Sequence, residues 1–372
     1  MLNDPGQASA VRQPRGVVKI GGSTFNSDSS VNVGSSPMRV DGWVEWHVDN
    51  NNFYQADRFE VSFAVSALPA DRGIDWFALQ QEISVEIFGG FPADPDNFYA
   101  SELQSWIYGF ADEVEESKDG RTIHLHGRDL TAKMIDAKTT NVYVNRTASD
   151  IAIMLATKYG LTPVVTKTIM KAGKYYELAH AHLHVARSEW DLLTFLAQQE
   201  QFVVYMLGRE LHFEPMPDLN SDPYVFQWGD APLNFNGSTL RFRRGLTLAK
   251  GIQVTVQSLN QHGKPITAIY PKTAGANAQK FSYRFANLTP EKALQKAQAL
   301  YHEIVRHEVN LSASMPADNL LTTRNIIKVN GTNTAYDQTY YPDHVRRSMS
   351  FDGGYSMEVT AKNQSPQTQV TI

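Results

Sequence analysis

The sequence has 372 residues, of which 42% are hydrophobic and 20% charged, and it contains no cysteine. At roughly 150 residues per domain, this length predicts two or three domains. Lys and Arg number 34 against 39 Asp and Glu, so the formal net charge is -5 and the basic excess of a dedicated nucleic-acid-binding protein is missing. The lack of cysteine excludes disulfides, thiolate nucleophiles and cysteine-ligated zinc or iron–sulfur sites.

The N-terminal region lacks the apolar segment of a secretory signal, and no stretch reaches the ~18 consecutive apolar residues of a membrane span. These features predict a protein that is made in the cytoplasm and remains there. Residues 21–36, GGSTFNSDSSVNVGSS, are poor in large apolar groups, and the end of the chain after Asn363 is similar. We therefore predict a flexible N-terminal arm over residues 1–37 and a C-terminal tail over 364–372.

Strand patterns dominate residues 38–130. Apolar residues alternate with polar or small ones along 58–68 and again along 83–87, which is the period of a half-buried strand. The Asp119-Gly120 pair favours a tight hairpin before residue 121. This region predicts an antiparallel meander that forms a barrel or a sandwich.

Helical patterns begin after residue 130. Thr147–Asp150 has the spacing of a capping box, and the helix that it starts should end at Gly160. Ser188–Asp191 repeats the capping spacing before a second apolar helix, and a hairpin should turn at Gly208-Arg209. Residues 131–237 are therefore predicted to be an inserted α/β module with connecting strands.

A second β region is predicted over 238–363, with one helix over 290–306. Thr289 can cap this helix, and Pro290 suits its first position. Asp352–Gly354 predicts the last hairpin turn, and the predicted strands of the region are 252–259, 310–315, 325–329 and 355–361. The fold class is therefore mainly β with an α+β insert.

The pattern His180-x-His182-x-His184 is the strongest candidate for a metal site, because alternate strand residues share one face. Alternate side chains of one strand lie ~6.5 to 7 Å apart, which is too far for three imidazoles to converge on one ion without distortion. A solvated polar face explains the pattern better. On the predicted helix, His302 and His307 are five residues apart, whereas a zincin needs a spacing of four, and the polar side of an amphipathic helix explains them.

Charged clusters offer weaker candidates. The carboxylates Asp112, Glu113, Glu115 and Glu116 could supply the acid and base of a hydrolase, but a solvated or channel-facing strand explains them more simply. The basic groups 241–244 and 346–347 could contact phosphate or an acidic protein surface. We predict no catalytic, cofactor-binding or metal-binding residue, because no common nucleophile or nucleotide-binding motif is present.

Several segments together resemble the baseplate hub family of contractile phage tails, which includes Mu-type tail hubs, the late control protein D group and the N-terminal part of type VI secretion spike proteins. The segments that carry this resemblance are FYQADRFEVSFAV (53–65), WIYGFADEVEESKDGRTIHLHGRDLTAKMID (106–136), TASDIAIMLATKYGL (147–161), SEWDLLTFLAQQEQFVVYMLGRELHFEP (188–215) and the run from Asn330 to Asn363. Together they cover the chain from about residue 38 to 363.

The resemblance implies two tail-tube-like antiparallel β-barrels, over 38–130 and 238–363, and a homotrimer that presents six barrels. Such a ring would join a six-fold tail tube to a three-fold spike and leave a channel for DNA or a tape-measure protein. Its implied partners are the tube and spike proteins, with tape-measure and baseplate wedge proteins as further candidates. DNA would be a passing cargo. The implied location is the virion baseplate, assembled in the host cytoplasm without membrane insertion.

The resemblance implies no enzymatic activity and no cofactor, because we find no further domain that could host a muramidase. Two alternatives remain open at the level of sequence. A tail-tip cell-wall hydrolase would use the acidic cluster, and a carbohydrate-binding tail protein would use some of the 6 Trp, 16 Tyr and 18 Phe residues.

Overall fold

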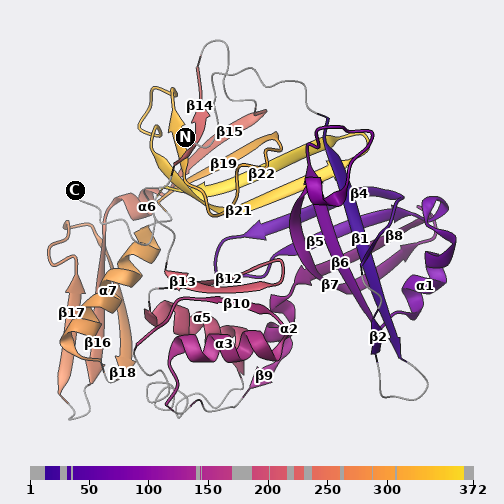
Figure 1. Ribbon diagram of the computed structural model, residues 1–372. Coiled ribbons are helices and arrows are strands. Elements are labelled where there is room, and N and C mark those ends of the chain that lie inside the picture. The colour runs from indigo at the N-terminus through magenta and orange to yellow at the C-terminus, as the bar shows by residue number, and fades with distance from the viewer. Residues whose placement is uncertain are drawn as a thin grey trace.

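Figure 1 shows a computed structural model of the chain. It describes residues 13–25, 32–34, 37–139, 143, 145–169, 187–200, 202–215, 222–229, 237–259, 264–286, 288–305 and 308–363. The predicted C-terminal tail, 364–372, lies outside these residues.

One sheet of 14 strands dominates the structure (Figure 1). Its main path, in spatial order, is β15 (Thr239–Arg244), β19 (Val309–Pro316), β22 (Gly354–Lys362), β21 (Thr339–Ser350), β4 (Trp43–Asn51), β5 (Arg58–Ala64), β8 (Thr122–Asp129), β7 (Gln104–Ser117), β6 (Glu82–Gly90), β1 (Arg15–Phe25) and β2 (Asn32–Gly34). Off this path, β3 (Met38–Arg39) pairs with β1, and β20 (Ile327–Asn330) pairs with both β21 and β14 (Tyr224–Gln227). The β-rich class is confirmed.

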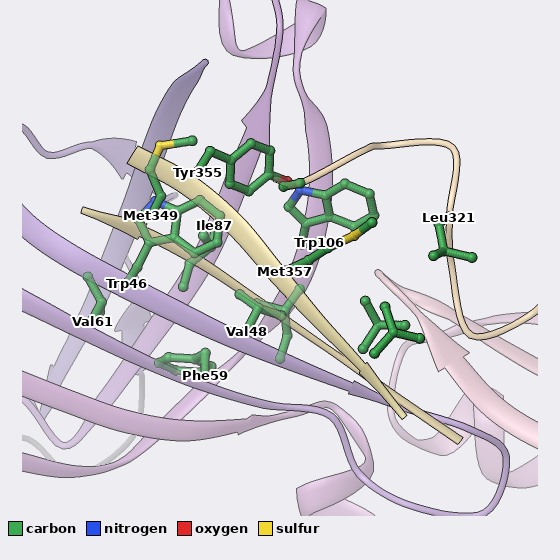
Figure 2. Packing of buried hydrophobic residues seen from close by; sticks show 14 of the residues in the cluster. Trp46, Val48, Phe59, Val61, Ile87, Trp106, Leu321, Met349, Tyr355 and Met357 are labelled. Atoms are coloured by element: carbon green, nitrogen blue, oxygen red, sulfur yellow. The ribbon is translucent and has the colours of Figure 1, made fainter. Parts of the chain in front are cut away.

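The two predicted β regions are joined into this one sheet by the antiparallel pairing of β4 with β21, in which Trp46 lies opposite Met349. Figure 2 shows the result, with side chains from β4, β5, β21 and β22 in one apolar cluster. Trp46 and Phe59 are fully buried there beside Met357. Because the two regions share a sheet and a core, the described strands do not close into two separate barrels.

The prediction of a flexible arm over 1–37 is wrong for β1. This strand pairs with β6 from Arg15 to Ser23 and buries Val17, Val18 and Ile20. The sequence pattern did not predict this strand, because Gly21 and Gly22 have no side chains that could show the strand period. Their backbone groups nevertheless pair with β6 and complete the ladder.

The insert contains the expected helices and hairpin. Its elements are α2 (Thr131–Asp136), β9 (Lys138–Thr139), α3 (Ala148–Lys158), β10 (Thr162–Val165), β11 (Arg187–Ser188), α5 (Glu189–Glu200), β12 (Phe202–Leu207) and β13 (Glu210–Pro215). Both capping boxes are confirmed: the Asp150 amide donates to Thr147 Oγ1 over 3.1 Å, and the Asp191 amide donates to Ser188 Oγ over 3.0 Å. Gly160, predicted as the stop of the first helix, has a φ of +66°.

A separate three-stranded sheet interrupts the second β region. It consists of β17 (Pro265–Tyr270), β16 (Ile252–Leu259) and β18 (Gln279–Ala286), packed against α7 (Pro290–Val305) around its own core. We expected 252–259 and the helix to belong to the second barrel. The helix covers this small sheet instead, because its apolar stripe matches the inward residues of β16.

The remaining helical segments are short. They are α1 (Ile74–Leu79), α6 (Leu246–Ala249) and the 3₁₀ turns Val65–Ala67, Ala70–Arg72 and Ala100–Glu102. In the part of the chain that the structure describes, no helix has the length and apolar character needed to cross a bilayer.

Candidate functional site

The large sheet has one apolar and one polar side. Along β7, β8, β5, β4 and β21, the residues that alternate with the core are polar, and we call their surface the polar face. Its members are Glu113, Glu115, His124, His126, Glu60, Ser62, Glu45, His47, Asp49, His344, Arg346 and Ser348. Such alternation is expected of an antiparallel sheet that packs on one side only.

Cross-strand pairs link the side chains of the polar face. The Asp49 carboxylate contacts His344 Nε2 at 3.0 Å and the Arg346 guanidinium at 3.4 Å. Burial raises the pKa of Asp49, but the His344 hydrogen bond and the Arg346 charge outweigh it and leave this pKa below its ordinary value. His47 Nδ1 lies 2.7 Å from Ser348 Oγ, so the pairs bridge β4 and β21, the strands that join the two β regions.

The predicted acidic cluster lies on the outer half of β7 and is exposed. Asp112 forms a bidentate pair with Arg128, at 2.7 and 2.8 Å. Glu113 and Glu115 lie opposite His126 and His124 on the polar face. The cluster therefore forms part of a solvated strand rather than a closed site with paired carboxylates.

The two predicted basic groups have different environments. Arg241 and Arg243 are exposed on β15, at one end of the large sheet, and Arg244 pairs with Glu308 at 2.9 Å. The pair 346–347 is split by the strand period: Arg346 lies on the polar face, whereas Arg347 points to the apolar side and has no exposed surface.

A cavity of about 140 Å³ lies beside Arg347, where three parts of the chain meet. We call it the junction cavity. The large sheet, the β12–β13 turn of the insert and the loop before β20 provide its lining, which includes Asn50, Asp57, Trp106, Asp129, Leu207, Gly208, Arg324 and Arg347. The β12–β13 turn of the insert therefore contacts the ends of β4, β7 and β8 at this cavity.

The Arg347 guanidinium is held by uncharged groups. Its Nη1 donates to Asn50 Oδ1 over 2.9 Å, its Nη2 donates to the Leu321 carbonyl, and its centre lies 3.5 Å from the centroid of the Trp106 ring. Burial lowers the pKa of Arg347 to about 10, so the group still carries its charge near neutral pH. Its Nε finds no hydrogen-bond partner among the described residues.

Two carboxyl groups also line the junction cavity, the half-buried Asp57 and the buried Asp129. Asp57 accepts hydrogen bonds from Asn50 Nδ2 at 2.8 Å and from the Asn51 amide at 2.7 Å. Asp129 accepts from the Thr131 amide at 3.0 Å. Burial is the largest cause that raises the pKa of both carboxyl groups, and the charge of Asp57 raises that of Asp129 further.

The histidine predictions have mixed outcomes. His180, His182 and His184 lie outside the described residues, as does His307. His302 is buried against Tyr270 and Tyr301, so the prediction that it lies on the polar side of the helix is wrong. Burial lowers its pKa. Among the residues that the structure describes, no cluster of His, Asp and Glu could hold a metal ion.

Sequence reasoning missed the junction cavity. One pattern could have indicated it, because charged residues occupy positions where the strand period demands an inward side chain. Asp129 continues the inward series of Ile123 and Leu125, and Arg347 lies between the inward residues Val345 and Met349. A charge at an inward position predicts a buried polar cluster.

No protein-family model matches the sequence, and no curated protein matches it either. Solved structures do match. A tail protein from Neisseria meningitidis superposes with a TM-score of 0.67 at 14% identity, over 93% of this chain and 96% of that one. The 43 kDa tail protein of prophage MuSo2 from Shewanella oneidensis gives 0.62 at 13% identity, over 94% and 96%.

A third match is a chain of the Francisella PdpA-VgrG complex, with a TM-score of 0.52 and 11% identity over 96% of this chain and 59% of that one. At such identities the likeness concerns the fold. The chain therefore has, along nearly its whole length, the fold of solved phage tail proteins.

Proposed function

We propose that this chain is a structural, non-enzymatic baseplate hub of a contractile phage tail or a phage-derived particle. The observation that carries the proposal is the fold, which matches phage tail proteins over more than nine-tenths of both chains. Fold alone does not fix function. The arrangement of the sheet and the character of its polar face add support.

The sheet suits a trimeric ring. Each chain contributes two groups of strands, one on each side of the β4–β21 pairing, so three chains would place six similar groups around one axis. Such a ring is pseudo-six-fold toward a tail tube and three-fold toward a spike, which removes the symmetry mismatch between them. The proposed partners are therefore a second and third copy of this chain, the tube protein and the spike protein, at the virion baseplate.

The polar face suits the wall of a channel for DNA or a tape-measure protein. Its side chains carry both signs of charge, and several are already paired, as Asp49 is with Arg346. Basic side chains that are already paired with carboxylates of the same surface bind phosphate weakly, so a polyanion would pass along this wall without binding tightly to it.

The edge strands of the large sheet, and β15 in particular, are the proposed contacts between copies. In the described part of the chain, β15 pairs with β19 alone. The Gly245 amide donates to the Glu308 carbonyl, so by the alternation of an antiparallel ladder the amides of Leu240 and Phe242 point away from β19. These outward amides can pair with a strand of the next copy.

The test is the oligomeric state and its dependence on β15. We expect a trimer by light scattering, and a ring with a central channel in an electron-microscopy view down the axis. Leu240→Pro removes one outward amide and should weaken trimerisation, whereas Leu240→Ala should not. A protein that stays monomeric at high concentration and binds neither tube nor spike protein would contradict the proposal.

The cell-wall hydrolase remains the alternative from another class. It predicts peptidoglycan cleavage that Glu113→Gln or Glu115→Gln abolishes. The exposure of both residues on an open strand favours the structural reading, because a general acid needs a sheltered site that raises its pKa. Glycan binding by the purified protein would instead support the carbohydrate-binding alternative.

A further inference from the structure

The small sheet and its helix form a basic part of an acidic protein. Residues 246–305 contain seven Lys and Arg but only two Asp and Glu, whereas the whole chain has a net charge of -5. We call this part the basic unit. A local excess of positive charge attracts a partner that carries negative charge. The fully exposed cations of the basic unit are Lys250, Lys264, Lys272, Lys280 and Arg284.

One edge of the basic unit offers an unpaired strand. β18 is an outer strand of the small sheet and, in the described part of the chain, pairs with β16 alone (Figure 1). The Gln279 amide donates to the Gly251 carbonyl. By the alternation of a ladder, the amides of Lys280, Ser282 and Arg284 therefore point away from β16. Because β18 keeps one continuous register with β16 and has no bulge, its outer edge can accept a further strand.

The face of β18 that points away from α7 is cationic. Lys280 and Arg284 are exposed there, and neither forms an ion pair with a described residue. The Arg284 Nε donates instead to the neutral Gln257 Oε1 over 3.3 Å. Like charges on paired strands repel, so two copies of this edge would pair poorly with each other, whereas a strand that carries carboxylates would be attracted.

The opposite face of β18 borders an apolar groove. α7 packs mainly over β16 and β17, so Phe281, Tyr283 and Phe285, which face the helix side, are only half-buried. Tyr283, Leu300 and Ile304 line a groove of about 430 Å³ between β18 and α7. A groove of this size admits the apolar side chains of a strand that lies next to β18.

We propose that the basic unit binds an acidic, extended segment of a partner protein, which adds as a strand to the outer edge of β18. Main-chain hydrogen bonds to residues 280–284 hold the segment. Strand side chains alternate between two faces, so the segment places carboxylates opposite Lys280 and Arg284 and apolar residues opposite Phe281 and Tyr283. This inference does not depend on the hub proposal, because it rests on the charge and the edge of the basic unit.

The test uses the full-length protein and a short end-blocked peptide with the core Glu-Val-Thr-Val-Glu. Calorimetry measures binding, which should weaken as the salt concentration rises. NMR-detected hydrogen exchange shows where the peptide binds. The amides of Lys280, Ser282 and Arg284 should become protected on binding, whereas those of Phe281 and Tyr283, which already face β16, should change little. This alternating pattern distinguishes strand addition from general attraction between charges.

Matched peptides and variants separate charge from main-chain pairing. A control peptide with Lys in place of both Glu residues should not bind. Arg284→Glu should weaken binding of the acidic peptide about tenfold. Lys264→Glu, the same charge change next to the outer strand β17, should have little effect. Ser282→Pro removes an outward amide and should weaken binding, whereas Ser282→Ala should not.

Three results would overturn the proposal. They are no binding of the acidic peptide, equal binding of the lysine peptide, and protection of the β18 amides without the alternating pattern. Tighter binding of a short DNA duplex than of the acidic peptide would also overturn it, because the partner would then be a nucleic acid. If Ser282→Pro does not fold, the exchange pattern of the unmodified protein and the surface variant Arg284→Glu still decide.

Discussion

The centre of the Arg347 guanidinium lies 3.5 Å from the centroid of the Trp106 ring, and this contact joins β21 to β7 across the core of the large sheet. The two strands belong to different halves of the chain and are not neighbours in the sheet. The contact therefore helps to hold the two β regions as one unit beneath the insert.

We expect Arg347→Ala to destabilise the protein by about 3 kcal/mol or more, because it removes the stacking on Trp106 and leaves the Leu321 carbonyl without its donor. Arg346→Ala, at the neighbouring half-exposed position, should cost less than about 1 kcal/mol. Denaturant unfolding measures both. Equal losses for the two variants would show that burial of Arg347 adds nothing to stability.

Asp129 should make stability fall as pH rises. Burial and the charge of Asp57 raise its pKa to about 8 in the folded state, against an ordinary value of 3.8. The folded state therefore binds more protons than the unfolded state, so this contribution is complete below pH ~4 and is lost as pH rises toward ~8. In Asp129→Asn the free energy of unfolding should depend less on pH in that window. Asp119→Asn, at an exposed hairpin tip, is the control and should keep the original dependence.

Strand β1 should be essential to the fold. Ile20 is fully buried against the core, so Ile20→Ala should cost about 2 to 5 kcal/mol. Lys19→Ala, at the neighbouring half-exposed position, should cost little. Thermal unfolding compares the two variants. Deletion of residues 1–36 should unfold the first strand group, and a deletion that left the melting temperature unchanged would contradict the pairing of β1 with β6.

The insert should be coupled to the large sheet through Tyr54. Its hydroxyl donates to the Phe202 carbonyl over 2.6 Å, and the Trp190 indole donates to the Tyr54 carbonyl over 2.9 Å. Tyr54→Phe should cost about 1 kcal/mol and increase hydrogen exchange in β12 and β13. Tyr99→Phe, at an exposed loop position, is the control. Unchanged exchange in β12 and β13 would show that other contacts hold the insert.

The sequence by itself determined the helix ends and turns that form through contacts between residues close together in the chain. The capping boxes at Thr147 and Ser188, the stop at Gly160 and the hairpin turn at Asp119-Gly120 follow from side chains within a few residues of the backbone that they satisfy. The β, α/β, β order followed from these elements, and the resemblance of their blocks to tail hubs agrees with the fold.

Only the tertiary structure decided which strands pair across long distances. The pairing of β4 with β21 joins residues about 300 positions apart, and the incorporation of β1 depends on backbone hydrogen bonds that Gly21 and Gly22 make without any side-chain pattern. The junction cavity also depends on contacts between residues that are far apart in the sequence. Asp57 precedes β5, Asp129 ends β8 and Arg347 lies on β21, and their raised or lowered pKa values arise only when the sheet and the insert pack together. A local pattern carries no information on such contacts, because their free energy depends on neighbours that the fold supplies.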